Sequence, residues 1–148
     1  MSGRVFQRNT GTANNPHDNC MTCGLYSKCN SPFMAVSGQG NLDCLIICES
    51  VAKSDDNQGK LFTGLPGWLF RKYLRVVGKD LEKDFFKISA LCCHSTTKPT
   101  AAKYRKCRRN MIKTLNEKQP KFVWLLGKGD VDTYYMGRKK DIGIMKLR

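Results

Sequence analysis

The stretch that decides the fold is LDCLIICESVAKSDDNQGKLFTGLPGWLFRKYL, residues Leu42–Leu74. It opens with a short apolar run, Cys44–Cys48, whose length and β-branched residues are typical of a strand buried on both faces. A polar loop with two adjacent carboxylates and Gly59 follows, and Pro66 then precedes apolar residues at helical spacing. The stretch therefore predicts a strand, an acidic loop and a helix, in that order.

Two side chains in this stretch are candidates for a site. Glu49 comes directly after the predicted strand, and ligands of open α/β sheets bind outside the carboxyl ends of the strands. Phe62 stands alone among polar and small residues of the loop. Such an aromatic residue is either a platform on which another ring stacks or a plug that fills the core.

Three later segments complete a β-α-β-α-β order. Asp84–Leu91 and Lys121–Gly127 are predicted strands, and Thr100–Leu115 has apolar residues at the spacing of an amphipathic helix. We expect another helix at 129–136 and a short terminal strand at 141–147. The order predicts an α/β protein with three layers, α/β/α, around a small and mainly parallel sheet.

The composition of the 148 residues favours an anionic partner inside the cell. Lys and Arg number 26 against 12 Asp and Glu, a formal charge of +14, and nucleic acid is the leading candidate. No apolar run approaches the length of a membrane span and the polar N-terminus has no signal-peptide core, so we expect an intracellular protein and no membrane partner. We expect 1–19 to be a flexible polar arm and 20–148 to be one domain.

The predicted helix Thr100–Leu115 is strongly basic outside its apolar stripe. A solvated face normally mixes both signs of charge, whereas this segment has no acidic residue before Glu117, which favours contact with phosphates. The candidate nucleic-acid-binding residues are Lys103, Arg105, Lys106, Arg108 and Arg109.

Eight cysteines in a chain without an export signal argue for metal or cluster ligation rather than for disulfides. Cys20 and Cys23 form a CxxC motif, a spacing that serves zinc, iron–sulfur clusters and redox dithiols alike. Cys29 either substitutes for a ligand or simply packs. The more distant candidates are Cys92, Cys93 and Cys107. Spacing alone does not choose iron over zinc.

From Cys48 to Gly67 the chain resembles the first active-site motif of the iron–sulfur branch (family 4 type) of the uracil-DNA glycosylase superfamily. The family pattern is roughly G-E-x-P-G-x-x-E-D-x-x-G-x-P-F-x-G-x-x-G. The matching positions are Glu49, Asp55, Asp56, Gly59, Phe62, Gly64 and Gly67. Cys48 replaces the first glycine and Val51-Ala52 replaces Pro-Gly. The resemblance is to a divergent or truncated member of the family, such as one from a phage or virus. The resemblance extends from about Cys20 to about Gly137.

The resemblance implies a role for several of these residues. Glu49 or Asp56 would be the catalytic carboxylate near the sugar or the attacking water. Phe62 and Gly64 would bind the substrate, with the Phe62 ring stacked on the flipped base. Ser89 stands where the family carries an asparagine that contacts uracil.

The resemblance also implies a [4Fe–4S] cluster, with zinc as the less favoured occupant. The family holds its cluster with a CxxC near the N-terminus, a third cysteine that ends a strand and a fourth on the next helix. Carried over to this chain, the ligands are Cys20, Cys23, Cys93 and Cys107, which leaves Cys92 as the spare.

Two departures from the family leave activity open. Ser89 replaces an amide, and the 148 residues contain no His-Pro, whereas the family has a second, His-Pro-Ser motif that supports the developing charge. Losing one such donor costs about two to three orders of magnitude in rate. Three readings remain: a uracil-DNA glycosylase, a catalytically impaired glycosylase-like nucleic-acid-binding accessory subunit of a replication, repair or transcription assembly, and a zinc-stabilised basic adaptor.

Overall fold

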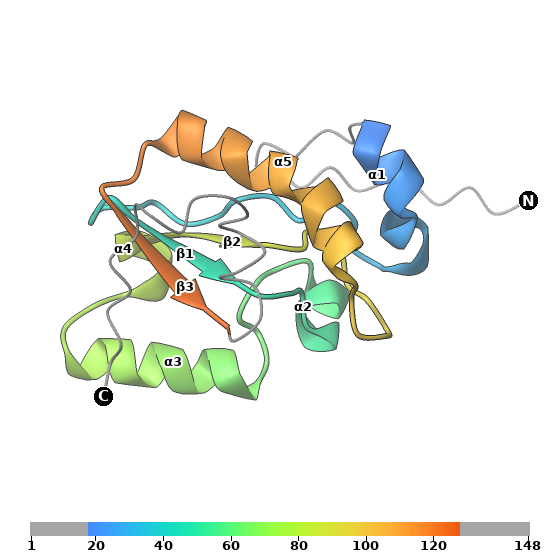
Figure 1. The fold of residues 1–148 in the computed structure, drawn as a ribbon. Coiled ribbons are helices and arrows are strands. Elements are labelled where there is room, and N and C mark those ends of the chain that lie inside the picture. The colour runs from blue at the N-terminus through green and yellow to red at the C-terminus, as the bar shows by residue number, and fades with distance from the viewer. Residues whose placement is uncertain (1–17, 128–148) are drawn as a thin grey trace, which may run out of the picture.

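Three parallel strands form the middle layer of the protein (Figure 1). The structure is a computed structural model that describes residues 18–127. The strands are β1 (Cys44–Cys48), β2 (Phe85–Ser89) and β3 (Phe122–Leu126), and their order in the sheet is β2-β1-β3. β1 is central because it pairs in parallel with both of the others. The three predicted strands and their parallel arrangement are confirmed.

Helices cover both faces of the sheet, which confirms the predicted three-layer α/β fold. α5 (Ala101–Lys118) lies over one face with α1 (Asp18–Cys23) packed beside it, and α3 (Leu65–Val76) lies under the other face (Figure 1). The remaining helices are α2 (Lys53–Gln58), α4 (Leu81–Asp84) and the 3-10 helix η1 (Leu25–Lys28). No helix in the described range is both long and apolar enough to cross a membrane.

The side chains of β1 alternate between two cores. Leu45 and Ile47 enter the core beneath α5, where they meet Tyr104 of that helix. Ile46 points the other way and packs with Leu74 of α3. Because both faces of β1 are covered, its sequence is a continuous apolar run and does not alternate with polar residues.

The acidic loop prediction was wrong, because the segment forms helix α2. Asp55 and Asp56 lie in its first turn, where carboxylates interact favourably with the N-terminal end of the helix dipole, and Gly59 caps its end with φ +64°.

The CxxC lies on α1, a short helix that was not predicted and that begins within the range assigned to the arm. The helix and strand expected at 129–136 and 141–147 lie outside the described residues.

A buried lysine lies between β2 and α3. The side chain of Lys87 is fully buried, and its Nζ donates to Glu82 Oε2. Glu82 Oε1 also accepts from Arg71 Nη2 at 2.7 Å, and Lys60 Nζ lies 3.6 Å from it. Burial raises the pKa of Glu82, but the hydrogen bonds from Lys87 and Arg71 outweigh burial and hold that pKa below its ordinary value of 4.5. One carboxylate therefore compensates a charge that would otherwise be buried alone.

Replacing this carboxylate should destabilise the fold. For Glu82→Gln we expect a loss of about 2 kcal/mol at neutral pH, less than for a fully buried pair because Glu82 is partly exposed. Since the folded protein lowers the pKa of Glu82, its contribution is present above the unfolded-state pKa near 4.5 and is lost as the pH falls through the folded-state pKa. Urea denaturation at a series of acidic and neutral pH values measures both effects.

The matched control is Lys60→Gln, which removes the more exposed partner of the same carboxylate. It should change the free energy of unfolding by less than about 0.5 kcal/mol. A Glu82→Gln protein with the parent's stability and the parent's pH profile would contradict the assigned role of this network.

Candidate functional site

The carboxyl edge of the sheet gathers the residues predicted to bind and act on a substrate. β1 and β2 are parallel with Cys48 opposite Ser89, so their ends meet at this edge. Glu49 follows Cys48 and is exposed. Phe62 and Cys48 both pack against the small buried cluster that contains Val51. The structure therefore brings Glu49, Phe62 and Ser89 to one end of the sheet.

Ser89 differs from the other two residues because it is buried, with 1% of its surface exposed. Its Oγ makes no well-formed hydrogen bond among the described residues, although the thiol of Cys48 lies beside it. Burial raises the pKa of Cys48 to about 11, and the contact with Ser89 opposes that rise in part. The hydroxyl predicted to contact a base thus lies beneath the surface of this edge.

The adjacent carboxylates of α2 hold two different loops. Asp55 Oδ1 accepts hydrogen bonds from the backbone N–H and the hydroxyl of Thr63, at 2.8 and 2.7 Å. Asp56 accepts from the backbone N–H of Asn30 at 3.0 Å and of Ser31 at 2.8 Å. Both carboxylates are buried. Asp56, a predicted catalytic residue, is therefore committed to the loop that follows η1, whereas Glu49 remains exposed.

The backbone at Phe62 is held in an unusual conformation. Its φ is +63°, which is uncommon for a residue other than glycine. Arg71 Nη1 donates to the Phe62 carbonyl oxygen, and a Cβ on Gly67 would lie 2.0 Å from that oxygen. The ring of Phe62 is tilted against Phe70 of α3, with 5.8 Å between the centroids. Phe62 is half-buried, and its ring packs against two buried clusters.

Gly64 lies directly after this loop and is the N-cap residue of α3. A Cβ at this position would lie 2.7 Å from Ser54 Oγ of α2. The glycine predicted from the motif thus allows α2 and the start of α3 to approach each other. With Thr63 held by Asp55, the end of the loop that leads into α3 is held against α2.

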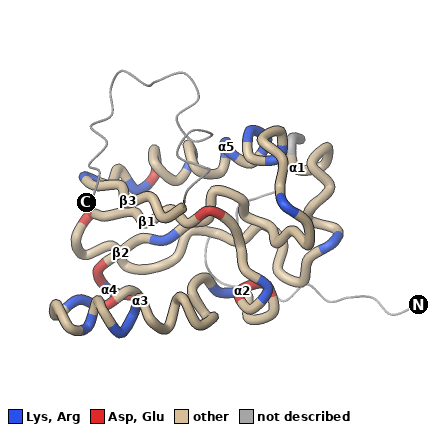
Figure 2. Tube along the Cα trace, turned by 60° about the horizontal axis from the view of Figure 1, so that its bottom comes forward, with Lys and Arg blue, Asp and Glu red and all other residues tan. Residues whose placement is uncertain are grey.

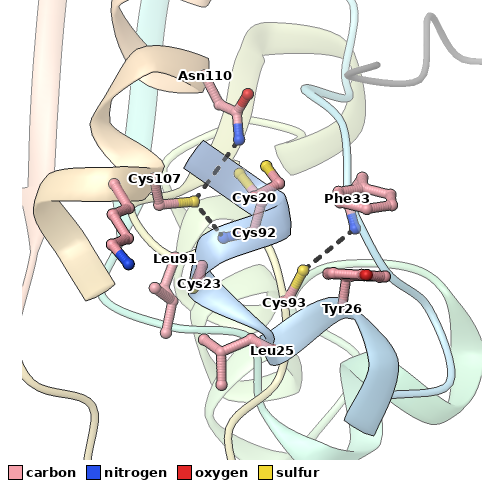
Figure 3. Close-up of a pocket in the computed structure, with 11 residues that line it drawn as sticks. Cys20, Cys23, Leu25, Tyr26, Phe33, Leu91, Cys92, Cys93, Cys107 and Asn110 are labelled. Atoms are coloured by element: carbon pink, nitrogen blue, oxygen red, sulfur yellow. Dashed lines mark hydrogen bonds between the residues drawn. The ribbon is translucent and has the colours of Figure 1, made fainter. Parts of the chain in front are cut away.

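A second cluster of functional side chains lines one cavity between α1, α5 and the segment after β2 (Figure 3). Cys20 and Cys23 come from α1, Cys93 from the segment after β2, and Cys107 from α5. All four predicted ligands therefore line the same cavity. The other lining residues are Leu25, Tyr26, Phe33, Leu91, Cys92, Lys106 and Asn110.

Two of the sulfur atoms in this cavity accept hydrogen bonds. Cys107 Sγ accepts from the backbone N–H of Cys92 at 3.2 Å and from the side-chain amide of Asn110 at 3.6 Å (Figure 3). Cys93 Sγ accepts from the backbone N–H of Phe33 at 3.4 Å. Contact with the Cys92 thiol, together with these donors, lowers the pKa of Cys107 to about 7 although burial opposes the change. The thiolate is the form of cysteine that binds metals.

Two cysteines whose roles the sequence left open lie beside predicted ligands, and one further neighbour, Asn110, was missed. The Cys29 thiol contacts that of Cys93, which lowers the pKa of Cys29, and the Cys92 thiol contacts that of Cys107. From the sequence, Cys29 was predicted as a possible ligand and Cys92 as the spare. Asn110 lies one turn after Cys107 on α5, a spacing that places both on one face. Within residues 18–127, no three His, Cys, Asp or Glu side chains converge closely enough to hold a single ion.

The predicted phosphate-binding residues all lie on α5 but differ in exposure. Arg105 and Arg109 are exposed and one turn apart. The half-buried ones are Lys103, Lys106 and Arg108. Lys106 Nζ donates to the Thr22 carbonyl oxygen at 3.0 Å and so joins α5 to α1 beside the cavity. Figure 2 shows basic positions along α5, of which Arg105 and Arg109 are the best placed to reach a phosphate.

Comparison with known proteins identifies the family. The family model of the uracil DNA glycosylase superfamily matches residues 36–147, a range that includes the sheet, the acidic helix α2 and the basic helix α5. The CxxC on α1 precedes the matched range. No curated protein matches the chain. The fold, the residues at the carboxyl edge of the sheet and this match together show that the chain belongs to the uracil-DNA glycosylase superfamily.

Proposed function

We propose that this protein binds DNA, carries a [4Fe–4S] cluster and hydrolyses the N-glycosidic bond of uracil. The observation that carries the proposal is the position of Glu49, exposed at the carboxyl end of the central strand. Enzymes that act on a base extrude it from the stack into a pocket. In a sheet of this kind the pocket lies outside the strand ends, where Glu49 would act on the water that attacks the sugar.

The other residues of this edge would position the substrate. Phe62 would stack on the extruded base, and its backbone is held for this purpose by Arg71 and by the close approach of Gly67. Asp56 would act indirectly, because its carboxylate already accepts hydrogen bonds from Asn30 and Ser31. Glu49 is therefore the carboxylate that we assign to the reaction, and Asp56 is a positioning residue.

Burial of Ser89 favours a second candidate function. An amide at a strand end can both donate to and accept from uracil, whereas a buried hydroxyl offers little to a base. Weak recognition of the base would leave a protein that binds DNA without efficient excision. Such a protein would serve as an accessory subunit of a replication, repair or transcription assembly.

The resemblance to the iron–sulfur branch of the family favours a cluster over zinc, and the common cavity of the four cysteines supports a shared site. Each cysteine of a [4Fe–4S] cluster binds a different iron, so the four sulfurs surround the cluster and do not converge on one point as the ligands of a single zinc ion do. One cavity is lined by Cys20, Cys23, Cys93 and Cys107. Backbone N–H groups donate to two of the sulfurs, and such hydrogen bonds tune the reduction potential of a cluster. When bound, the cluster would join α1, the segment after β2 and α5.

Metal analysis tests the cluster. Protein purified without oxygen should be brown and contain about four irons per chain. Cys107→Ser should lose the iron and lower the melting temperature, because metal binding contributes to folding. Cys44→Ser is the matched control, since Cys44 is a half-buried cysteine that packs on the α3 side of the sheet, and it should keep its iron. Stoichiometric zinc without iron would refute the cluster.

Salt-dependent DNA binding tests the basic helix. Replacing both Arg105 and Arg109 with Ala should weaken binding to DNA and lower the slope of log K against log salt concentration by about 0.7 to 0.9 for each phosphate that the variant no longer neutralises. The control replaces Lys72 and Arg75 with Ala, which removes the same charge from α3 on the other face of the sheet. Equal effects of the two double variants would show that α5 is not the DNA-binding surface.

An excision assay on labelled uracil-containing strands, single and double, tests the reaction. We expect slow excision that Glu49→Gln reduces by about 100-fold or more, since positioned acids and bases contribute at least that factor. The variant should still bind DNA, because the basic residues assigned to phosphate contact lie on α5 and are unchanged. DNA binding without any excision by the parent protein would reject the glycosylase and favour the accessory subunit.

A further inference from the structure

Helix α3 carries apolar side chains on the face that points away from the sheet. Leu65, Leu69, Tyr73 and Val76 have 76%, 42%, 64% and 78% of their surface exposed. Because successive residues of a helix turn by about 100°, these four lie in a line opposite the buried Leu74; we call them the α3 stripe. Scattered exposed apolar residues are normal, but a contiguous group of this size marks an interaction site.

The two flanks of the α3 stripe differ in charge. On one flank lie Lys72 and Arg75, with Lys72 Nζ 5.5 Å from the centroid of the exposed Trp68 ring. On the other flank Phe70 packs edge-on against Trp124 of β3, with 5.4 Å between the centroids. α3 has basic residues but no acidic residue (Figure 2). The stripe therefore has a cationic border on one side and an apolar border on the other.

We propose that the α3 stripe binds an acidic amphipathic helix of another protein. Apolar residues of the partner would cover the stripe, and carboxylates on one side of the partner would face Lys72 and Arg75. The 12 residues of α3 span about 18 Å, enough for a partner helix of three to four turns. Helices commonly bind in this way, with anchors one turn apart and charges that fix orientation.

The charge pattern argues against two other occupants of the α3 stripe. Two copies of this chain would bring the same cations together, and each copy carries a formal charge of +14. DNA would be attracted to the cations but would leave the apolar residues uncovered.

The test uses the full chain and a designed peptide of about 18 residues, long enough to be helical. The peptide has leucines at one-turn spacing and glutamates along one flank, and a second peptide has lysine in place of each glutamate. Fluorescence anisotropy of the labelled peptides measures affinity. Leu69→Ser with Val76→Ser alters the stripe. Ile112→Ser is the matched control, because Ile112 on α5 has the same exposed fraction as Leu69, 42%.

We expect saturable binding of the acidic peptide and affinity at least about tenfold lower for the lysine peptide. The double serine variant should lose about tenfold or more, and Ile112→Ser should bind as the parent does. Changing Lys72 and Arg75 to Glu should reverse the preference between the peptides. Circular dichroism checks that each variant is folded.

Several outcomes would overturn the proposal. Absence of binding to the acidic peptide, equal affinity for both peptides, or equal loss in Ile112→Ser and the double serine variant would each do so. Self-association that the double serine variant abolishes would assign the stripe to a second copy of the chain. Binding to phosphatidylcholine–phosphatidylserine vesicles through Leu69 and Val76, without peptide binding, would assign it to a lipid surface.

Discussion

The carboxylate of Asp56 links the two functional regions of this protein. It is buried and accepts hydrogen bonds from the backbone of Asn30 and Ser31, in the segment that leads from the cysteine-bearing helix to the sheet. Hydrogen bonds to a charged group contribute about 1.5 to 3 kcal/mol each. The neighbouring Asp55 holds Thr63, beside the aromatic ring at the strand ends. One short helix, α2, therefore fixes the cysteine cavity and the candidate active site relative to each other.

The sequence predicted the sheet well because strands buried on both faces have a distinct pattern. Cys44–Cys48 matched β1 residue for residue, and the periodicity of α5 was equally clear. The α2 segment was misread as a loop because Ser, Asp and Asn favour turns as much as first helical turns. Its carboxylates are held by partners distant in the chain or beyond the helix, and such partners leave no trace in local sequence.

The candidate site was predictable only in part. The four cysteines were assigned to one site through the resemblance to a family, because their spacing does not reveal that α1 packs on α5. The structure adds that packing and the N–H groups that donate to two of the sulfurs. Exposure was not predictable either. Glu49 and Ser89 both lie at strand ends, yet one is exposed and the other is buried. Ser89 is still paired within the sheet, opposite Cys48, whereas Glu49 lies one residue beyond the end of β1.

The strand order β2-β1-β3 has a consequence for how the chain folds during synthesis. β1 is made first of the three but needs partners on both sides, and the second of these, Phe122–Leu126, is the last described strand to leave the ribosome. Until β3 has been made, Leu45, Ile46 and Ile47 lack one of the two strands that flank them in the sheet. Distant parallel pairings form slowly and leave apolar edges exposed to other chains. Nascent chains of this protein would therefore depend on chaperones more than those of a helical bundle of equal size.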